Sequence, residues 1–418
     1  MSDYLPPEVW INVLKRLPVK SLLRFRSVCK EWYSLITNPH FISQHLDASL
    51  ATPRTLVRYI TQNPDPPDCP LIEHYSFRLD NSHGFDEYAE HESPTKNPGS
   101  RFHIFGSCNG LLCLYGCLAE NSFPKLLLWN PLVGKSLAVP GLGAGGWFQT
   151  FGFGFDELRN DHKVVAILAL DIQGFQPRVE IYSLNSGMWR EISPEALRCP
   201  VPFKFPQAYL NGVAHWVATD PRTQSSDAKH SCIVTFGFKD EVFGEMTLPA
   251  TRSMLSEITM EYLTVLQDSL SFVNIANDLG DGEHPSCWVW VMEKYGGEES
   301  WTLLFRVDTS SVLDWPVGFR MNGELAMETR EASLVSYDPE SKQVKDLGIH
   351  GCELVQNENA RRTRSFYMGK YVESLILLER EASAPEHTGT IDEYSLFVAE
   401  FKRAVDVILR ILTGEEED

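Results

Sequence analysis

A pattern that recurs about every fifty residues constrains this chain most. An aromatic strand, a turn and a second short strand start at positions 129, 182, 236, 291 and 337, which are 53, 54, 55 and 46 residues apart. Asn-Gly pairs joined to apolar strands precede several copies, as at Asn109-Gly110 and Asn211-Gly212. Asn-Gly tolerates the positive φ that a tight hairpin turn requires. The repeat therefore predicts a mainly β domain built from equivalent units of short strands.

A period near fifty residues with four strands per unit favours a kelch-like β-propeller. The stretch from about 55 to 380 makes roughly six such periods, so we expect about six blades. Residues 366–368 and 371–378 should close the last blade together with strands from residues 55–80, because closure leaves no free edge strand. An open β-sandwich is the alternative, since it shows the same alternation.

The first 45 residues have a different, helical pattern. Trp10, Leu14 and Leu17 recur at helical spacing, and Pro18 ends that helix because proline breaks the backbone ladder. A second helical stripe consists of Leu22, Phe25, Cys29, Trp32 and Ile36. A unit this small cannot bury so much apolar surface internally. The surplus predicts a patch that another protein covers.

The helical stretch resembles the three-helix F-box, the module by which substrate receptors dock on the Skp-type adaptor of cullin–RING ubiquitin ligases. Leu5-Pro6, Leu14, Leu17-Pro18, the basic run 20–26, Val28-Cys29 and Trp32 stand at the family's spacing. The resemblance implies binding to the Skp-type adaptor and, through it, to a cullin and a RING subunit. The adaptor-binding residues that it implies are Leu5, Pro6, Leu14, Leu17, Pro18, Leu22, Val28, Cys29 and Trp32. An ordinary helical subdomain packed on the rest of the chain is the alternative.

The remainder resembles the plant F-box-associated domain. Residues 153–156 followed by 161–165, and the stretch 347–351, carry this resemblance, which runs from about 103 to 378 in the family's order. The whole chain thus resembles a plant F-box/kelch-repeat protein. It departs from the family's pattern in a long acidic linker at 61–101 and in a tail after residue 380.

These observations divide the chain into four parts. We expect the F-box at 1–45, a linker with the first strands at 46–101, the propeller at 102–380, and a C-terminal helix with an acidic tail at 381–418. Within the linker, residues 56–60 and 74–79 indicate strands. Residues 80–101 read as a long polar loop.

The last part of the sequence predicts an amphipathic helix. Asp392 can cap it, and Gly414 ends it. Its apolar face consists of Phe397, Phe401, Val405, Ile408 and Leu412. Residues 415–418 form an acidic end. Packing on the propeller or on the F-box is the favoured role of this helix, and binding to a separate partner is the alternative.

Composition indicates a soluble globular protein, with 43% hydrophobic and 22% charged residues among 418. No apolar run reaches the length of a membrane span. Nine scattered cysteines and the lack of a basic, apolar leader lead us to expect reduced thiols in the cytoplasm or nucleus. Residues 1–45 hold six Lys/Arg and three Asp/Glu, so their +3 leaves −22 for the remainder of a chain of net charge −19. The basic module suits an acidic partner, whereas the acidic body argues against nucleic acid.

The motifs that could suggest catalysis have simpler explanations. Gly152-Phe153-Gly154 lacks the Lys-Ser/Thr of a phosphate loop, and glycines between aromatic residues favour a bulge or crowded packing. Cys108, Cys113 and Cys117 have no histidine pair at ligand spacing, so buried thiols are favoured over a metal site. His215 is expected in the core. No spacing supports a copper site of Tyr, His and Cys, and no cofactor is expected.

We therefore expect a non-catalytic substrate receptor. An adaptor-bound scaffold or lectin-like propeller without a role in degradation is the alternative, and a propeller enzyme ranks lowest. Two polar stretches, 220–230 and 277–286, lack a core pattern and are the expected target-binding loops, because loops on rigid scaffolds commonly carry function. Their candidate contact residues are Asp220, Arg222, Asp227, His230, Asn277, Asp278, Asp281 and His284.

Overall fold

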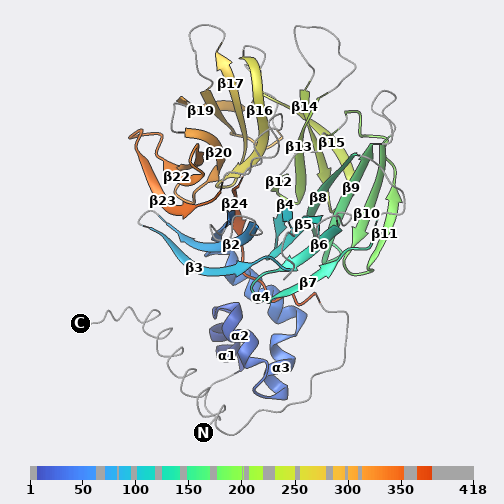
Figure 1. The fold of residues 1–418 in the computed structure, drawn as a ribbon. Coiled ribbons are helices and arrows are strands. Elements are labelled where there is room, and N and C mark those ends of the chain that lie inside the picture. Colours follow the sequence, from blue (N-terminus) through green and yellow to red (C-terminus); the bar gives the residue numbers. More distant parts are fainter. Residues whose placement is uncertain are drawn as a thin grey trace, which may run out of the picture.

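The chain folds into a small helical unit joined to a six-bladed β-propeller (Figure 1). The computed structural model describes residues 7–62, 71–81, 84–95, 101–117, 125–141, 148–169, 177–199, 201, 207–219, 231–249, 255–278, 286–296, 300–308, 313–352 and 365–378. In these ranges the propeller predicted from the fifty-residue repeat is confirmed, and the sandwich alternative is excluded, because the six four-stranded sheets follow one another around a ring. The expected C-terminal helix lies outside the described residues.

The helical unit contains four helices in the described part of the chain, one more than the expected three. They are α1 (Pro7–Leu14), α2 (Val19–Phe25), α3 (Lys30–Ile36) and α4 (Pro39–Leu50). The second predicted stripe divides because Cys29 is extended, with φ −156° and ψ 167°, and begins α3 instead of continuing α2. Asn38 then caps α4 by accepting a hydrogen bond from His40 N at 2.8 Å. The unit thus runs to residue 50, past the expected boundary at 45.

Each blade is an antiparallel sheet of four strands, counted here from the centre of the ring outward. The first strands are β4 (Arg101–Cys108), β8 (Phe148–Asp156), β12 (Ala208–Leu210), β16 (Leu255–Leu266), β20 (Leu313–Phe319) and β24 (Tyr367–Tyr371). The second are β5 (Leu111–Cys117), β9 (Asp161–Ala169), β13 (Val213–Thr219), β17 (Ser269–Asp278), β21 (Leu325–Thr329) and β1 (Arg54–Gln62). The third are β6 (Lys125–Asn130), β10 (Pro177–Ser183), β14 (Ser231–Gly237), β18 (Ser286–Met292), β22 (Ser333–Tyr337) and β2 (Leu71–Asp80). The outer strands are β7 (Lys135–Ala138), β11 (Met188–Ile192), β15 (Val242–Thr247), β19 (Trp301–Asp308), β23 (Val344–His350) and β3 (Phe85–Glu92).

The ring closes by pairing strands from the two ends of the propeller, as expected. Strand β24 lies antiparallel to β1, with Leu56 opposite Gly369. The expected closing strand at 371–378 is only partly correct, because β24 ends at Tyr371. Beyond it the backbone bonds to a side chain instead of a neighbouring strand: Asn130 Nδ2 donates to the carbonyls of Ser374 and Ile376, both at 2.9 Å.

The prediction of a long polar loop at 80–101 is wrong. Residues 85–92 form β3, the outer strand of the closing blade, and pair with β2. Polar residues are tolerated there because one face of an outer strand is solvated. The strand's inner contacts come from a few residues: the Arg54 guanidinium lies 4.5 Å from the Tyr88 ring centroid, and Ala89 is paired with Phe77.

The two faces of the propeller carry different connections. Strands alternate in direction, so first-to-second and third-to-fourth connections meet at one face, and the others meet at the opposite face. Connections of the first kind are short, as at Asn109-Gly110, where both residues have positive φ (49° and 79°), as the Asn-Gly pattern predicted. We call this the helix face, because the chain enters β1 there from α4. The far face receives the longer connections 63–70, 118–124, 170–176, 193–207, 220–230, 279–285 and 351–366.

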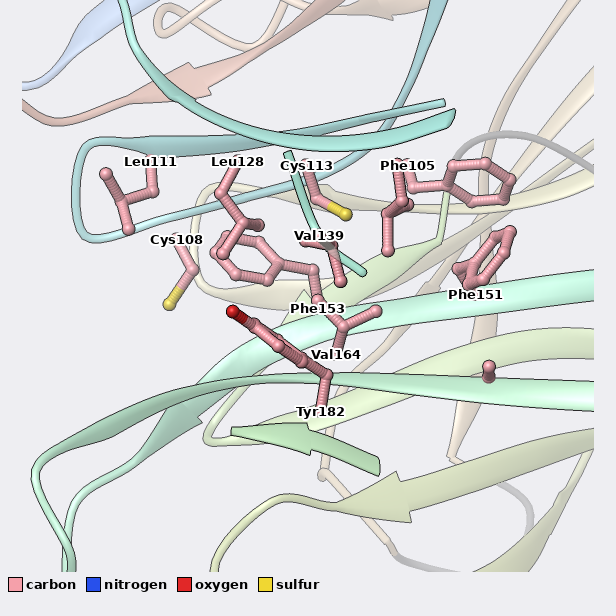
Figure 2. Packing of buried hydrophobic residues seen from close by; sticks show 12 residues of the cluster. Phe105, Cys108, Leu111, Cys113, Leu128, Val139, Phe151, Phe153, Val164 and Tyr182 are labelled. Atoms are coloured by element: carbon pink, nitrogen blue, oxygen red, sulfur yellow. The ribbon is translucent and has the colours of Figure 1, made fainter. Parts of the chain in front are cut away.

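The core lies between neighbouring blades. Figure 2 shows side chains from the β4–β7 and β8–β11 blades, including Phe105, Phe151 and Phe153, packed against one another. Cys108 and Cys113 lie in this cluster, and burial raises the pKa of both thiols, that of Cys108 to about 12. They are therefore core residues, as the spacing indicated. The side chain of Cys117 lies outside the described residues.

Crowding between blades explains the glycines of β8. A Cβ on Gly152 would lie 2.6 Å from the Trp216 ring, and one on Gly154 would lie 2.3 Å from the Phe238 ring. Both distances are shorter than real carbon contacts, so an adjacent blade occupies the space of the missing side chains. The crowded-packing interpretation of Gly152-Phe153-Gly154 is confirmed.

Candidate functional site

An apolar contact joins the helical unit to the helix face of the propeller. Leu375, which is 1% exposed, is part of the same buried cluster as Leu14 and Leu22. Leu132 and Val133, from the turn between β6 and β7, pack against this cluster as well. The propeller therefore supplies part of the core that the small helical unit could not complete alone.

A polar contact reinforces the same junction. The backbone N–H of Val19, the first residue of α2, donates to Glu373 Oε2 at 3.2 Å. The other carboxylate oxygen of Glu373 lies 3.3 Å from Arg54 Nη2, at the start of β1. Glu373 is 6% exposed, so these partners replace the water that its charge would otherwise bind. We call residues 372–376, with their partners at Val19 and Arg54, the latch.

Three of the predicted adaptor-binding residues lie in the interior of the helical unit. Leu14 is 1% exposed, Leu17 is 6% exposed and Leu22 is fully buried. Side chains with so little accessible surface act on a partner only by holding the helices in place. Their recurrence at helical spacing reflects core packing within the unit and against Leu375.

The other predicted adaptor-binding residues in the described range are accessible. Pro18 is exposed, and Val28, Cys29 and Trp32 are half-buried. The Trp32 ring packs edge-on against Phe25, with centroids 5.3 Å apart. Trp10 meets Trp32 at 6.4 Å, also edge-on. Exposed basic side chains on α2 and α3 are Lys20, Arg24 and Lys30. Leu5 and Pro6 lie outside the described residues. The unit thus offers a half-buried aromatic surface on basic helices.

The strand ends at the predicted target-binding loops lie on the far face. Stretch 220–230 connects β13 to β14 and stretch 279–285 connects β17 to β18, and these two blades are neighbours. Asn277 and Asp278 are the last residues of β17. The remaining candidates, Asp220, Arg222, Asp227, His230, Asp281 and His284, lie outside the described residues. The expected adaptor and target surfaces therefore belong to opposite faces of the ring.

The buried histidines of the propeller are structural. His215 is fully buried, and its ring nitrogens lie 3.3 Å from Ala208 O and 2.8 Å from Tyr295 Oη. Burial lowers the pKa of His215 to about 4, and that of His162 to about 3. His215 is thus a core histidine, as expected. Among the described residues no three His, Cys, Asp or Glu side chains gather as metal ligands, and no helix is long and apolar enough to cross a membrane.

Sequence reasoning did not identify Glu373 or Leu375 as junction residues. The run 371–378 is apolar enough to read as one continuous strand, and that interpretation hid the change of role after Tyr371. The charge of Glu373 within this run was the available signal, because a carboxylate in a buried segment requires a partner.

Comparison with known proteins agrees with this architecture. The F-box domain family matches residues 3–44, and the family described as the F-box associated beta propeller domain matches residues 72–378. Among solved structures, an oligogalacturonate lyase in complex with manganese aligns over 74% of this chain and 89% of its own, at 11% identity and a TM-score of 0.39. That score is too low to transfer a function.

Curated relatives from Arabidopsis thaliana have the same two parts in their names. F-box protein At3g07870 is 28% identical over 84% of this chain and 88% of its own length. F-box protein CPR1 is 27% identical over 83% and 85%, and F-box/kelch-repeat protein At3g23880 is 29% identical over 72% and 79%. With both family matches in the order that the fold shows, the chain belongs to the F-box proteins that carry an F-box associated β-propeller domain.

Proposed function

We propose that this protein is the substrate-recognition subunit of a Skp–cullin–F-box ubiquitin ligase in the cytoplasm or nucleus. The helical unit docks on the Skp-type adaptor, which connects it to the cullin and the RING subunit. The propeller recruits a target protein for ubiquitination and degradation. The observation that carries the proposal is the opposition of the two surfaces: the F-box is fixed to the helix face, and the longer connections leave the far face.

The proposed mechanism is proximity and needs no catalytic residue in this chain. The conjugating enzyme on the RING subunit carries ubiquitin as a thioester, and a lysine of the target attacks it. A receptor that holds both partners converts this encounter into a local one, with a raised effective concentration of target lysines. The latch suits this role, because two contacts joining Glu373 to Val19 and Arg54 fix the F-box relative to the propeller.

Affinity capture with the proteasome blocked tests the proposal. The intact chain should recover the adaptor, the cullin and one or more targets whose abundance rises when the proteasome is blocked. Trp32→Ala should lose the adaptor and cullin but keep the targets. Recovery of adaptor and cullin without any target turnover would favour an adaptor-bound scaffold or lectin-like propeller. Retention of the adaptor by Trp32→Ala would argue against docking through the half-buried aromatic surface.

A further inference from the structure

A groove of about 710 Å³ lies where the helical unit meets the propeller. Leu17 and Pro18 form one wall, α4 forms another through residues such as Ala48, and Arg54 with Glu373 closes the propeller side. Because Leu17 and Pro18 are also predicted adaptor-binding residues, the groove adjoins the surface expected to bind the adaptor. Any occupant of the groove would compete for part of that surface.

The groove is basic at the F-box end. Lys15 and Arg16 line it, and Arg16 is exposed. Glu373 is already engaged by Val19 and Arg54, so Asp47 is the remaining acidic side chain of the lining. The apolar wall between these charges suits an occupant with an apolar stripe followed by acidic residues.

The chain itself contains such a segment. Residues 379–418 hold eleven Asp/Glu and four Lys/Arg, a net charge of −7, whereas residues 1–45 carry +3. The stripe predicted from the sequence includes Ile408 and Leu412, and residues 415–418 are all acidic. The order of apolar stripe and acidic end matches the order of apolar wall and basic end in the groove.

The segment also starts beside the groove. Glu373 lines it, and the described chain continues only to Leu378. Five residues span at most about 18 Å, so residue 379 begins within that distance of the groove wall. Attachment this close keeps the segment at a local concentration of the order of millimolar, which turns a weak contact into a populated one.

We propose that the segment 392–418 docks on the F-box of its own chain, with Ile408 and Leu412 against the apolar wall of the junction groove and residues 415–418 against Lys15 and Arg16. Docking covers Pro18 and therefore competes with the adaptor. This second consequence rests on the proposed receptor function, whereas the docking itself does not.

Zero-length carbodiimide cross-linking of the dilute full chain, without adaptor, tests the docking. Mass spectrometry should find the Lys15 amine joined to a carboxylate of residues 415–418. Hydrogen exchange should show protected amides between 397 and 412. Cross-links to lysines of the propeller, cross-links that grow with protein concentration, or no cross-link to Lys15 would each overturn the proposal.

Two full-length variants and their matched controls locate the contact. Ile408→Asp/Leu412→Asp should lower the exchange protection about tenfold, since the contact is exposed and modest, and Ala399→Asp on the opposite side of the predicted helix should not. Lys15→Glu/Arg16→Glu should lower it similarly, and Lys20→Glu/Lys30→Glu outside the groove should not. Glu415→Lys/Glu416→Lys should restore the protection in the Lys15→Glu/Arg16→Glu background. Equal effects of variants and controls would overturn the proposal.

A separate binding measurement tests the competition. Ile408→Asp/Leu412→Asp should bind purified adaptor about three- to tenfold more tightly than the natural chain, because the groove is vacated. Unchanged affinity would overturn competition while the cross-link still establishes docking. Absence of adaptor binding by every variant would instead reject the proposed receptor function.

Discussion

The N–H of Val19 and the carboxylate of Glu373 meet at 3.2 Å although 354 residues separate them in the chain. The contact places the start of α2 against the last described segment of the propeller. Since Leu375 also completes the core of the helical unit, the F-box and the propeller share both a polar and an apolar contact. Their relative orientation is therefore set by the fold, and residues 51–53 alone do not determine it.

The latch should contribute measurably to stability. Glu373→Ala removes a buried acceptor from Val19 and a partner from Arg54, and we expect a loss of about 2 kcal/mol in the free energy of unfolding. Glu87, whose side chain is 48% exposed and pairs with Arg78 at 3.3 Å, provides the control. Glu87→Ala should cost about 0.5 kcal/mol or less. Urea denaturation measures both, and equal losses would show that Glu373 acts only as a surface charge.

Buried and half-buried F-box residues should respond differently to truncation. Leu17→Ala should destabilise the helical unit by about 2–4 kcal/mol, because Leu17 is 6% exposed and part of its core. Trp32→Ala should weaken adaptor binding by more than about 2 kcal/mol, as buried interface aromatics do. Hydrogen exchange of α1–α4 and titration with purified adaptor separate the two effects. Loss of helix protection in Trp32→Ala equal to that in Leu17→Ala would contradict this division.

Target choice should reside in the connections of the far face. Replacing 220–230 or 277–286 by short Gly-Ser turns should change which proteins are captured and leave adaptor binding intact, because these stretches join strands that end away from the F-box. Replacement of the helix-face turn 184–187 is the matched control and should preserve the target list. Release of the adaptor by a loop exchange would mean that the F-box contacts those loops.

Two buried histidines should make the propeller sensitive to acid. Unfolded histidine titrates near pH 6.5, whereas burial lowers the pKa of His162 to about 3 and of His215 to about 4. Below pH 6.5 the unfolded chain therefore binds protons that the folded chain does not, and stability falls as pH falls towards 4. The loss should reach about 2 kcal/mol per histidine at pH 5.

Urea unfolding at pH 7.5 and pH 5 checks this expectation. His162→Phe removes one titrating group between Phe153 and Phe155, so it should reduce the difference in unfolding free energy between the two pH values by about 2 kcal/mol. His40→Gln, on the exposed side of α4, should leave the difference unchanged. A difference as large in His162→Phe as in the natural chain would assign the acid sensitivity to other groups.

The sequence predicted the blade number and the closure because both rest on local signals. Asn109-Gly110 and Asn211-Gly212 demand positive φ, and the aromatic strands recur at a nearly constant spacing. Strand β3 was missed because Phe85 and Tyr88 are its few large apolar residues, so an outer strand with one solvated face resembled a loop. Local composition reports burial only indirectly, through the number of faces that a strand hides.

The junction could not be predicted from the same signals. Glu373 finds Val19 and Arg54 only after the ring closes, and Leu375 finds Leu14 and Leu22 only once α2 is oriented. Nothing in the spacing of either segment specifies the other. For the same reason the helical stripe containing Leu14 and Leu22 suggested a docking surface, although its partner is another part of the same chain.

The pairing of β24 with β1 has a consequence for synthesis of the protein. During translation the F-box and β1 leave the ribosome first, and β1 must wait for residues 367–371 before its outer neighbours gain an inner one. The helical unit likewise lacks Leu375 until almost the whole described chain has been made. A message truncated before codon 367 therefore yields a chain with an open strand edge and an incomplete helical core, the features by which cellular quality control recognises unfinished proteins.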